Sequence, residues 1–119
     1  MNEQARILVI DDDPAMAVLF GHLLGERFRV TGAKNGKNGL QKAESDPPDL
    51  IFLDLRLPDL DGVEVLRRLR AFDAAVPVIA LTGFESVETA VQMMKLGAYD
   101  YVPKPLPAGR LQIIVEHAL

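Results

Sequence analysis

Leu50-Ile51-Phe52-Leu53-Asp54 is the stretch that decides the fold. Four consecutive apolar residues, without the alternation of a half-exposed strand, indicate a strand buried on both faces of a parallel sheet. The run ends in an aspartate. Because sites in open parallel sheets form beyond the carboxyl ends of the strands, Asp54 is the first candidate for a functional residue.

Four further apolar runs recur on either side of this strand at wide and fairly even intervals. They occupy residues 7–10, 28–30, 76–81 and 99–102. The run at residues 28–30 is the weakest, and we expect it to be an edge strand. Several of the others are continuous, which again favours strands that are covered on both faces by helices.

The segments between these runs carry the apolar spacing of amphipathic helices. Asp13 is a good N-cap before Pro14, and Gly25 is suited to the end of that helix. Residues 37–44 form a shorter and weaker helical pattern. The core-facing sets that the spacing predicts are Met16, Leu19, Phe20, Leu23 and Leu24; Val65, Leu69 and Phe72; Val87, Ala90, Val91 and Met94 after Ser86; and Leu111, Ile114, Val115 and Ala118 after Pro107.

The order of these elements is strand then helix, five times over. Such alternation predicts a doubly wound α/β fold, with parallel strands, right-handed crossovers and helices on both faces of the sheet. We find no internal repeat, linker or low-complexity segment in the sequence. All of residues 1–119 are therefore expected to form one domain.

Composition excludes several classes of protein. Hydrophobic residues make up 49% of the chain and charged residues 25%, which is the balance of a packed globule. The lack of cysteine excludes disulfides, thiolate zinc sites and thiol catalysis. A net charge of -4 argues against direct nucleic-acid binding by this chain, because phosphate binding needs a basic surface.

The sequence also carries no sign of membrane insertion. No apolar run approaches the roughly 20 residues that a membrane helix needs. Residues 1–6 lack the apolar core of a signal peptide. We therefore expect a cytoplasmic protein with no membrane contact.

Polar residues gather where the predicted strands end. The first run ends in Asp11-Asp12-Asp13, the third in Asp54, and the fourth in Thr82-Gly83, while Lys104-Pro105 closely follows the fifth. The carboxyl ends of parallel strands share one edge of the sheet. Three carboxylates, a hydroxyl and an ammonium are thus expected to converge there, with Asp13 set aside as the helix cap.

The acids at this edge indicate a hard metal ion. Asp11 and Asp12 face a third carboxylate, Asp54, and the three would repel one another unless a cation intervenes. Oxygen ligands with no histidine or cysteine nearby suit magnesium, which takes one or two carboxylates together with waters and phosphate oxygens. Taken singly, Thr82 could be an ordinary strand end, Lys104 a solvated surface lysine and Tyr101 a half-buried core aromatic.

Taken together, these residues resemble the receiver domain of two-component response regulators. The resemblance runs from about Arg6 to the C-terminus, and residues 81–101 look especially like receivers of the nitrogen-regulation type. The matching landmarks are Asp11-Asp12, Asp54 followed by Leu55-Arg56-Leu57-Pro58, Asp61-Gly62, Leu81-Thr82-Gly83, Tyr101 and Lys104-Pro105.

The resemblance implies a flavodoxin-like sheet with strand order 2-1-3-4-5 and a role for each site residue. Asp54 would accept a phosphoryl group, and Thr82 and Lys104 would contact its oxygens. Magnesium would be bound by Asp12 and Asp54 directly, by Asp11 through water, and by the backbone carbonyl of Arg56. Thr82 and Tyr101, near the ends of neighbouring strands, would form a switch that reshapes a distant surface.

The resemblance also implies partners. The phosphoryl group would come from a sensor histidine kinase or a phosphotransfer protein, and the expected output is control of transcription. A homodimer could form through the face made by the helix from Val87, the fifth strand and the last helix. Any enzymatic activity would be limited to self-phosphorylation and autodephosphorylation.

Two other functions use some of the same residues. A hydrolase of the haloacid dehalogenase kind would use Asp11 as nucleophile and Asp13 as acid, but it needs a further acidic motif after the lysine. A flavodoxin-like nucleotide binder is disfavoured by the acidic first loop, which would repel phosphate. The hydrolase is distinguished from a receiver by which aspartate becomes phosphorylated. The nucleotide binder is distinguished by whether flavin is bound.

Overall fold

The computed structural model describes residues 4–83, 87–104 and 108–119 and contains one parallel five-stranded sheet of order β2-β1-β3-β4-β5. Strands and helices alternate along the chain, as the sequence predicts. The doubly wound α/β fold and its strand order are confirmed. The elements are β1 (Ala5–Ile10), α1 (Pro14–Leu24), the short 3-10 helix η1 (Gly25–Arg27), β2 (Phe28–Ala33), α2 (Gly36–Ser45), β3 (Leu50–Asp54), α3 (Gly62–Phe72), β4 (Val78–Thr82), α4 (Val87–Lys95), β5 (Asp100–Pro103) and α5 (Ala108–Ala118).

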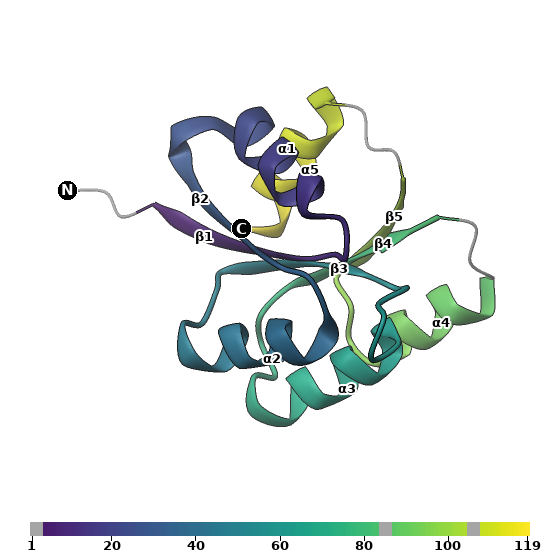
Figure 1. Cartoon of the computed structure of the whole chain (residues 1–119). Coiled ribbons are helices and arrows are strands. Elements are labelled where there is room, and N and C mark those ends of the chain that lie inside the picture. The colour runs from purple at the N-terminus through teal and green to yellow at the C-terminus, as the bar shows by residue number, and fades with distance from the viewer. Residues whose placement is uncertain (1–3, 84–86, 105–107) are drawn as a thin grey trace.

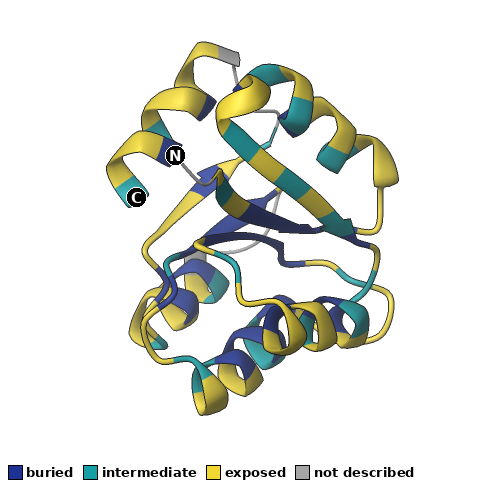
Figure 2. Ribbon diagram, turned by 90° about the vertical axis from the view of Figure 1, so that its left-hand side faces the viewer, coloured by how far each residue is buried: buried dark blue, intermediate teal, exposed yellow. Residues whose placement is uncertain are grey.

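Helices cover both faces of the sheet. Figure 1 shows α1 and α5 on one face and α2, α3 and α4 on the other. The central strands are buried while the outer sides of the helices are exposed, as the dark blue and yellow ribbons of Figure 2 show. All five residues of β3 are buried, which explains its unbroken run of apolar residues.

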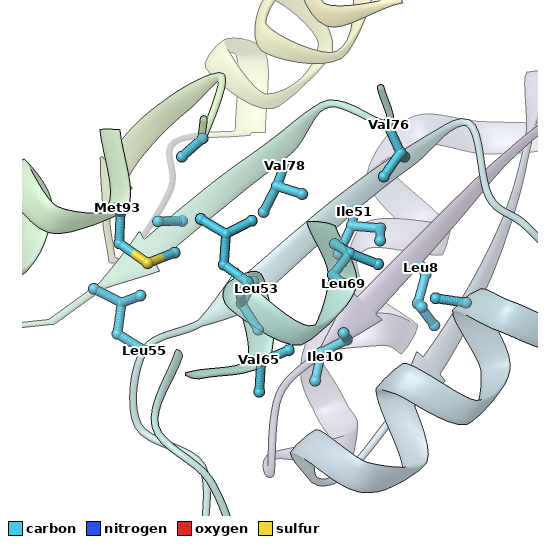
Figure 3. Packing of buried hydrophobic residues seen from close by; sticks show 14 of the residues in the cluster. Leu8, Ile10, Ile51, Leu53, Leu55, Val65, Leu69, Val76, Val78 and Met93 are labelled. Atoms are coloured by element: carbon cyan, nitrogen blue, oxygen red, sulfur yellow. The ribbon is translucent and has the colours of Figure 1, made fainter. Parts of the chain in front are cut away.

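Alternate residues of the central strands supply two separate cores. Ile51 and Leu53 point toward α2, α3 and α4, where they meet Leu66, Leu69 and Met93. Figure 3 shows this cluster, including Leu53, Leu69 and Met93. Phe52 belongs to the other core, where its ring lies edge-on to Phe20 of α1 with 4.9 Å between centroids.

The predicted ends of α1 are confirmed. The Asp13 carboxylate accepts a hydrogen bond from the Ala15 N–H at 3.0 Å, and Pro14 occupies the first turn. The helix ends at Gly25, whose φ of 71° lies in the left-handed region that favours glycine. Ser86 and Pro107, the expected starts of two other helices, lie outside the described residues.

The predicted core faces of three helices were partly wrong. Leu19, Phe72, Val91 and Met94 are exposed to 48%, 42%, 45% and 43%, whereas Leu66 and Met93 are fully buried. Among the residues of α4 whose side chains the structure describes, a set without Val87, the buried ones are Ala90 and Met93. Apolar residues on adjacent faces of this helix fit two alternative stripes. The predicted set of α5 is confirmed, with Leu111 and Val115 fully buried.

The fourth strand begins later than predicted. Val76 and Pro77 precede β4, although Val76 is buried and the Pro77 carbonyl accepts the Ile51 N–H at 3.0 Å. Proline lacks the N–H that a central strand needs, so regular pairing starts at Val78.

Across the described residues, every helix is too short or too polar to cross a bilayer.

Candidate functional site

Three carboxylates converge beyond the carboxyl ends of β1 and β3. Carboxylate oxygens of Asp11, Asp12 and Asp54 lie within 4.8 Å of one another. Asp11 and Asp54 are buried, with only 3% and 5% of each residue exposed, while Asp12 is exposed to solvent. The convergence of acids that the sequence predicts is confirmed.

The turn after β1 is held by its own acids. The Asp11 N–H donates to the Ala33 carbonyl at the end of β2, at 2.9 Å. The Asp11 Oδ1 accepts the Asp13 N–H at 2.9 Å, which fixes the first residues of the loop. Asp13 itself caps α1 and is not part of the carboxylate cluster.

The Lys104 ammonium lies between two of the buried acids. Its Nζ donates to Asp11 Oδ2 at 2.8 Å and to Asp54 Oδ2 at 3.1 Å. The Lys104 N–H also donates to the Thr82 carbonyl at 2.7 Å, which anchors the backbone of the lysine to the end of β4. The sequence placed Lys104 at this edge, but it gave no signal for the bond to Asp11.

Burial sets the electrostatics of this pair. Burial raises the pKa of the Asp54 carboxyl, and the Arg56 N–H and the Lys104 ammonium offset only part of that effect. Burial also disfavours the charged form of Lys104, but its bonds to Asp11 and Asp54 outweigh this and raise its pKa. The lysine thus stays protonated and is paired with two of the three acids of the cluster. The cluster favours binding of a further cation.

Arg56 and Thr82 lie at the same edge. The Arg56 N–H donates to Asp54 Oδ1 at 3.1 Å. Thr82 is the last residue of β4 and is 8% exposed. Among the described residues, its hydroxyl donates only a long hydrogen bond of 3.5 Å, to the Gly83 carbonyl. Pro105, which follows Lys104, lies outside the described residues.

Tyr101 is further from the edge than the sequence suggested. It pairs with Ala80, whereas Thr82 pairs with Pro103. The tyrosine is 48% exposed, so about half of it is buried. Together with Ala90, Val91, Met94 and Lys95 it lines an open groove along α4.

The donor set of the carboxylate cluster fits a hard divalent cation. All three candidate side chains offer oxygen atoms, and the strand ends hold those oxygens within the span of one ion's coordination shell. Asp11, Asp12 and Asp54 can thus hold a metal.

Comparison with known proteins agrees with this site. Residues 7–116 match the family model of the response regulator receiver domain. The chain is 40% identical to the transcriptional regulatory protein ZraR of Klebsiella oxytoca over 98% of its length, and 38% identical to the nitrogen assimilation regulatory protein NtrX of Azorhizobium caulinodans over 95%. It spans about a quarter of these relatives, 27% and 26% of their lengths.

A solved structure shows the same fold. The crystal structure of the receiver domain of NtrX from Brucella abortus superimposes with a TM-score of 0.86 at 33% identity, covering 95% of this chain and 97% of that one. The similarity to proteins of the nitrogen-regulation type that residues 81–101 predict is thereby confirmed.

Proposed function

Because this chain belongs to the response regulator receiver domain family, we propose that its residues 1–119 form a phosphoacceptor domain in which Asp54 takes a phosphoryl group from a phosphohistidine. The donor is a sensor histidine kinase or a phosphotransfer protein. One observation carries the proposal: Asp54 is a buried carboxylate at a strand end, bonded to Lys104 and clustered with two other acids.

The chemistry is phosphoryl transfer between two side chains. A carboxylate oxygen of Asp54 forms a bond to phosphorus as the bond from phosphorus to the donor imidazole nitrogen breaks, and an acyl phosphate results. Lys104 and the Arg56 N–H already donate to the acceptor, so both can donate to the oxygens of the incoming group. Fixed donors and charge neutralisation are what such a transfer demands of the protein.

The metal that the cluster would hold is magnesium. Asp12 and Asp54 would bind it directly, Asp11 through water, and the Arg56 carbonyl would complete the protein ligands. When bound, magnesium neutralises charge on the carboxylates and on the phosphoryl oxygens. The role of the protein is to hold the carboxylate oxygens within 4.8 Å of one another before any ligand arrives.

Thr82 and Tyr101 are proposed as the switch. The hydrogen bond from the Thr82 hydroxyl to the Gly83 carbonyl is long, at 3.5 Å, so breaking it costs little free energy when the hydroxyl turns toward a phosphoryl oxygen. Tyr101 is half exposed beside α4 and can then move inward. The surface that changes is formed by α4, β5 and α5, through which a homodimer could assemble.

The output proposed for the whole protein is control of transcription. The support is that similar chains form about a quarter of proteins named as transcriptional regulators. This chain carries a net charge of -4, so DNA contact is assigned to other segments or partners. The domain itself would do no catalysis beyond its own phosphorylation and dephosphorylation.

The hydrolase alternative is disfavoured by the position of Asp13. That mechanism needs Asp13 as a free acid, but its carboxylate caps α1 through the Ala15 N–H. The two functions also differ in the phosphorylated residue, which is Asp54 in a receiver and Asp11 in the hydrolase.

The test is to incubate the protein with acetyl phosphate and magnesium and to map the label by peptide mass spectrometry. We expect one phosphoryl group on Asp54 and none in the Asp54→Asn variant, whose fold is checked by circular dichroism. Label on Asp11, or no label at all, would refute the proposal.

A further inference from the structure

The loop between β3 and α3 is held by hydrogen bonds at both ends. It begins at Leu55 and contains Arg56, whose N–H donates to the acceptor carboxylate at 3.1 Å. Arg56 forms an antiparallel bridge with Asp61, and the Gly62 N–H donates to the Leu55 carbonyl at 3.1 Å. At the far end, the Asp61 carboxylate caps α3 through the Glu64 N–H at 2.8 Å.

The tip of the same loop is bound to a different helix. Asp59 Oδ1 accepts the Gly36 N–H at 2.7 Å, and Oδ2 accepts the Lys37 N–H at 2.9 Å. These are the first two residues of α2, whose unpaired N–H groups and dipole favour a carboxylate. The two carboxylate oxygens of Asp59 thus connect α2 to the loop that follows Asp54.

Asp59 is not the N-cap residue of α2. The helix has its own N-cap, because Asn35 Oδ1 accepts the Asn38 N–H at 2.7 Å and the Asn35 carbonyl accepts the Gly39 N–H at 3.0 Å. Asp59 is an exposed residue, so it also contributes little to the core. Its two hydrogen bonds link the loop to residues that lie 22 and 23 positions earlier in the sequence.

The junction is also closely packed beside these hydrogen bonds. A Cβ atom on Gly36 would lie 2.9 Å from Val65 Cγ2 and 3.1 Å from Leu60 Cβ, so the start of α2 touches both the loop and α3. A Cβ on Gly62 would lie 2.8 Å from the Leu55 Cα. Figure 1 shows α2 and α3 side by side under the same face of the sheet.

We propose that Asp59 is a positioning residue for phosphoryl transfer. Its two hydrogen bonds to the N-terminus of α2 hold the loop so that the Arg56 backbone faces Asp54. The inference rests on the proposed function of Asp54. Asp59 does not touch the acceptor. It acts by fixing the segment that supplies the Arg56 N–H and the Arg56 carbonyl, since small displacements of such groups slow a reaction strongly.

The test compares Asp59→Ala with Asn35→Ala. Both remove a side-chain acceptor from the N-terminus of α2, but only the first releases the loop. With acetyl phosphate at saturating magnesium, we expect Asp59→Ala to slow labelling of Asp54 by about fivefold or more, and Asn35→Ala to stay within about twofold of wild type. Asp59→Asn keeps one acceptor oxygen and should give an intermediate rate.

Equal labelling rates in Asp59→Ala and wild type would overturn the inference. So would equal slowing in both alanine variants, because the effect would then come from α2 alone. Hydrogen exchange of the Arg56 amide supplies a readout independent of the reaction. If wild type takes no label, the proposed function fails, while faster exchange of that amide in Asp59→Ala than in Asn35→Ala would still support the positioning role, and equal exchange would overturn it.

Discussion

Lys104 Nζ lies 3.1 Å from Asp54 Oδ2, so the buried acceptor has a cation beside it before any phosphoryl group or metal is bound. The same ammonium is 2.8 Å from Asp11 Oδ2. The lysine therefore serves as the counterion of two acids that would otherwise face each other. Under the proposed function, these bonds would be redistributed when a phosphoryl group arrives.

Replacing Lys104 with alanine should destabilise the metal-free protein. Asp11 and Asp54 would remain buried without their shared donor, and loss of hydrogen bonds to charged groups costs about 1–3 kcal/mol. Magnesium should restore part of the loss, because it also neutralises the two acids. Urea unfolding at neutral pH, with magnesium and with a chelator, measures both effects. An unchanged midpoint in the chelator would contradict this expectation.

The acids of the cluster should differ in their effect on magnesium. Asp12→Ala should abolish magnesium binding in titration calorimetry, while Asp11→Ala should weaken it less, because Asp11 is expected to act through water and already bonds Lys104. Asp13→Ala is the matched control. It removes an adjacent acid that caps α1, so it should lower stability by about 1 kcal/mol and leave the affinity for magnesium unchanged. Equal affinities in wild type and Asp12→Ala would refute the assignment.

The switch should depend on Thr82. Beryllofluoride with magnesium imitates the phosphoryl group on Asp54, and we expect it to shift amide signals of Gln92, Lys95, Asp100 and Arg110. In Thr82→Ala, Asp54 should still be phosphorylated. The distant shifts should shrink, because the variant lacks the hydroxyl that is proposed to couple Asp54 to Tyr101. Coupling free energies of this kind are typically about 1–3 kcal/mol. Shifts confined to the residues around Asp54 would count against transmission through Tyr101.

Stability should fall in acid partly because of Asp59. Desolvation alone would raise the pKa of its carboxyl, but the Lys37 and Gly36 N–H groups outweigh that and hold the pKa below its usual value. The contribution of the ionised form is complete above the unfolded pKa of about 4 and is lost as the pH falls through the lower folded value. Thermal midpoints of Asp59→Asn should therefore vary less than those of wild type below about pH 4. Parallel curves for the two proteins would show that Asp59 does not contribute.

The sequence predicted what depends on repeated patterns. Continuous apolar runs identified the buried strands, and the positions of Asp11, Asp54, Thr82 and Lys104 at their ends predicted where the site lies. The strands and the convergence of these side chains were predicted correctly because a parallel sheet leaves few alternatives for its strand ends. The buried face of α4 was harder to predict, because Val91 and Met94 satisfy the helical spacing as well as Met93 does.

Contacts between loops could not be predicted in this way. The bonds of Asp59 to Gly36 and Lys37, and of Lys104 to Asp11, join residues far apart in the sequence. Asp59 carries no local signal, since an aspartate after Pro58 is an ordinary turn residue. Its partner is determined only when α2 packs against α3.

β3, the strand that ends in Asp54, is buried along its whole length and has a neighbour on each side. Central strands of this kind open only when the whole protein unfolds, whereas loops fluctuate separately. The acceptor is thus attached to a strand that opens only on global unfolding. Apart from Thr82 at the end of β4, the groups proposed to assist it come from the loops after β1 and β3 and from Lys104, which follows β5. Resistance to unfolding and speed of reaction therefore depend largely on different residues. Evolution can retune how fast such a signal is received by changing loops, without rebuilding the core that keeps the receiver folded.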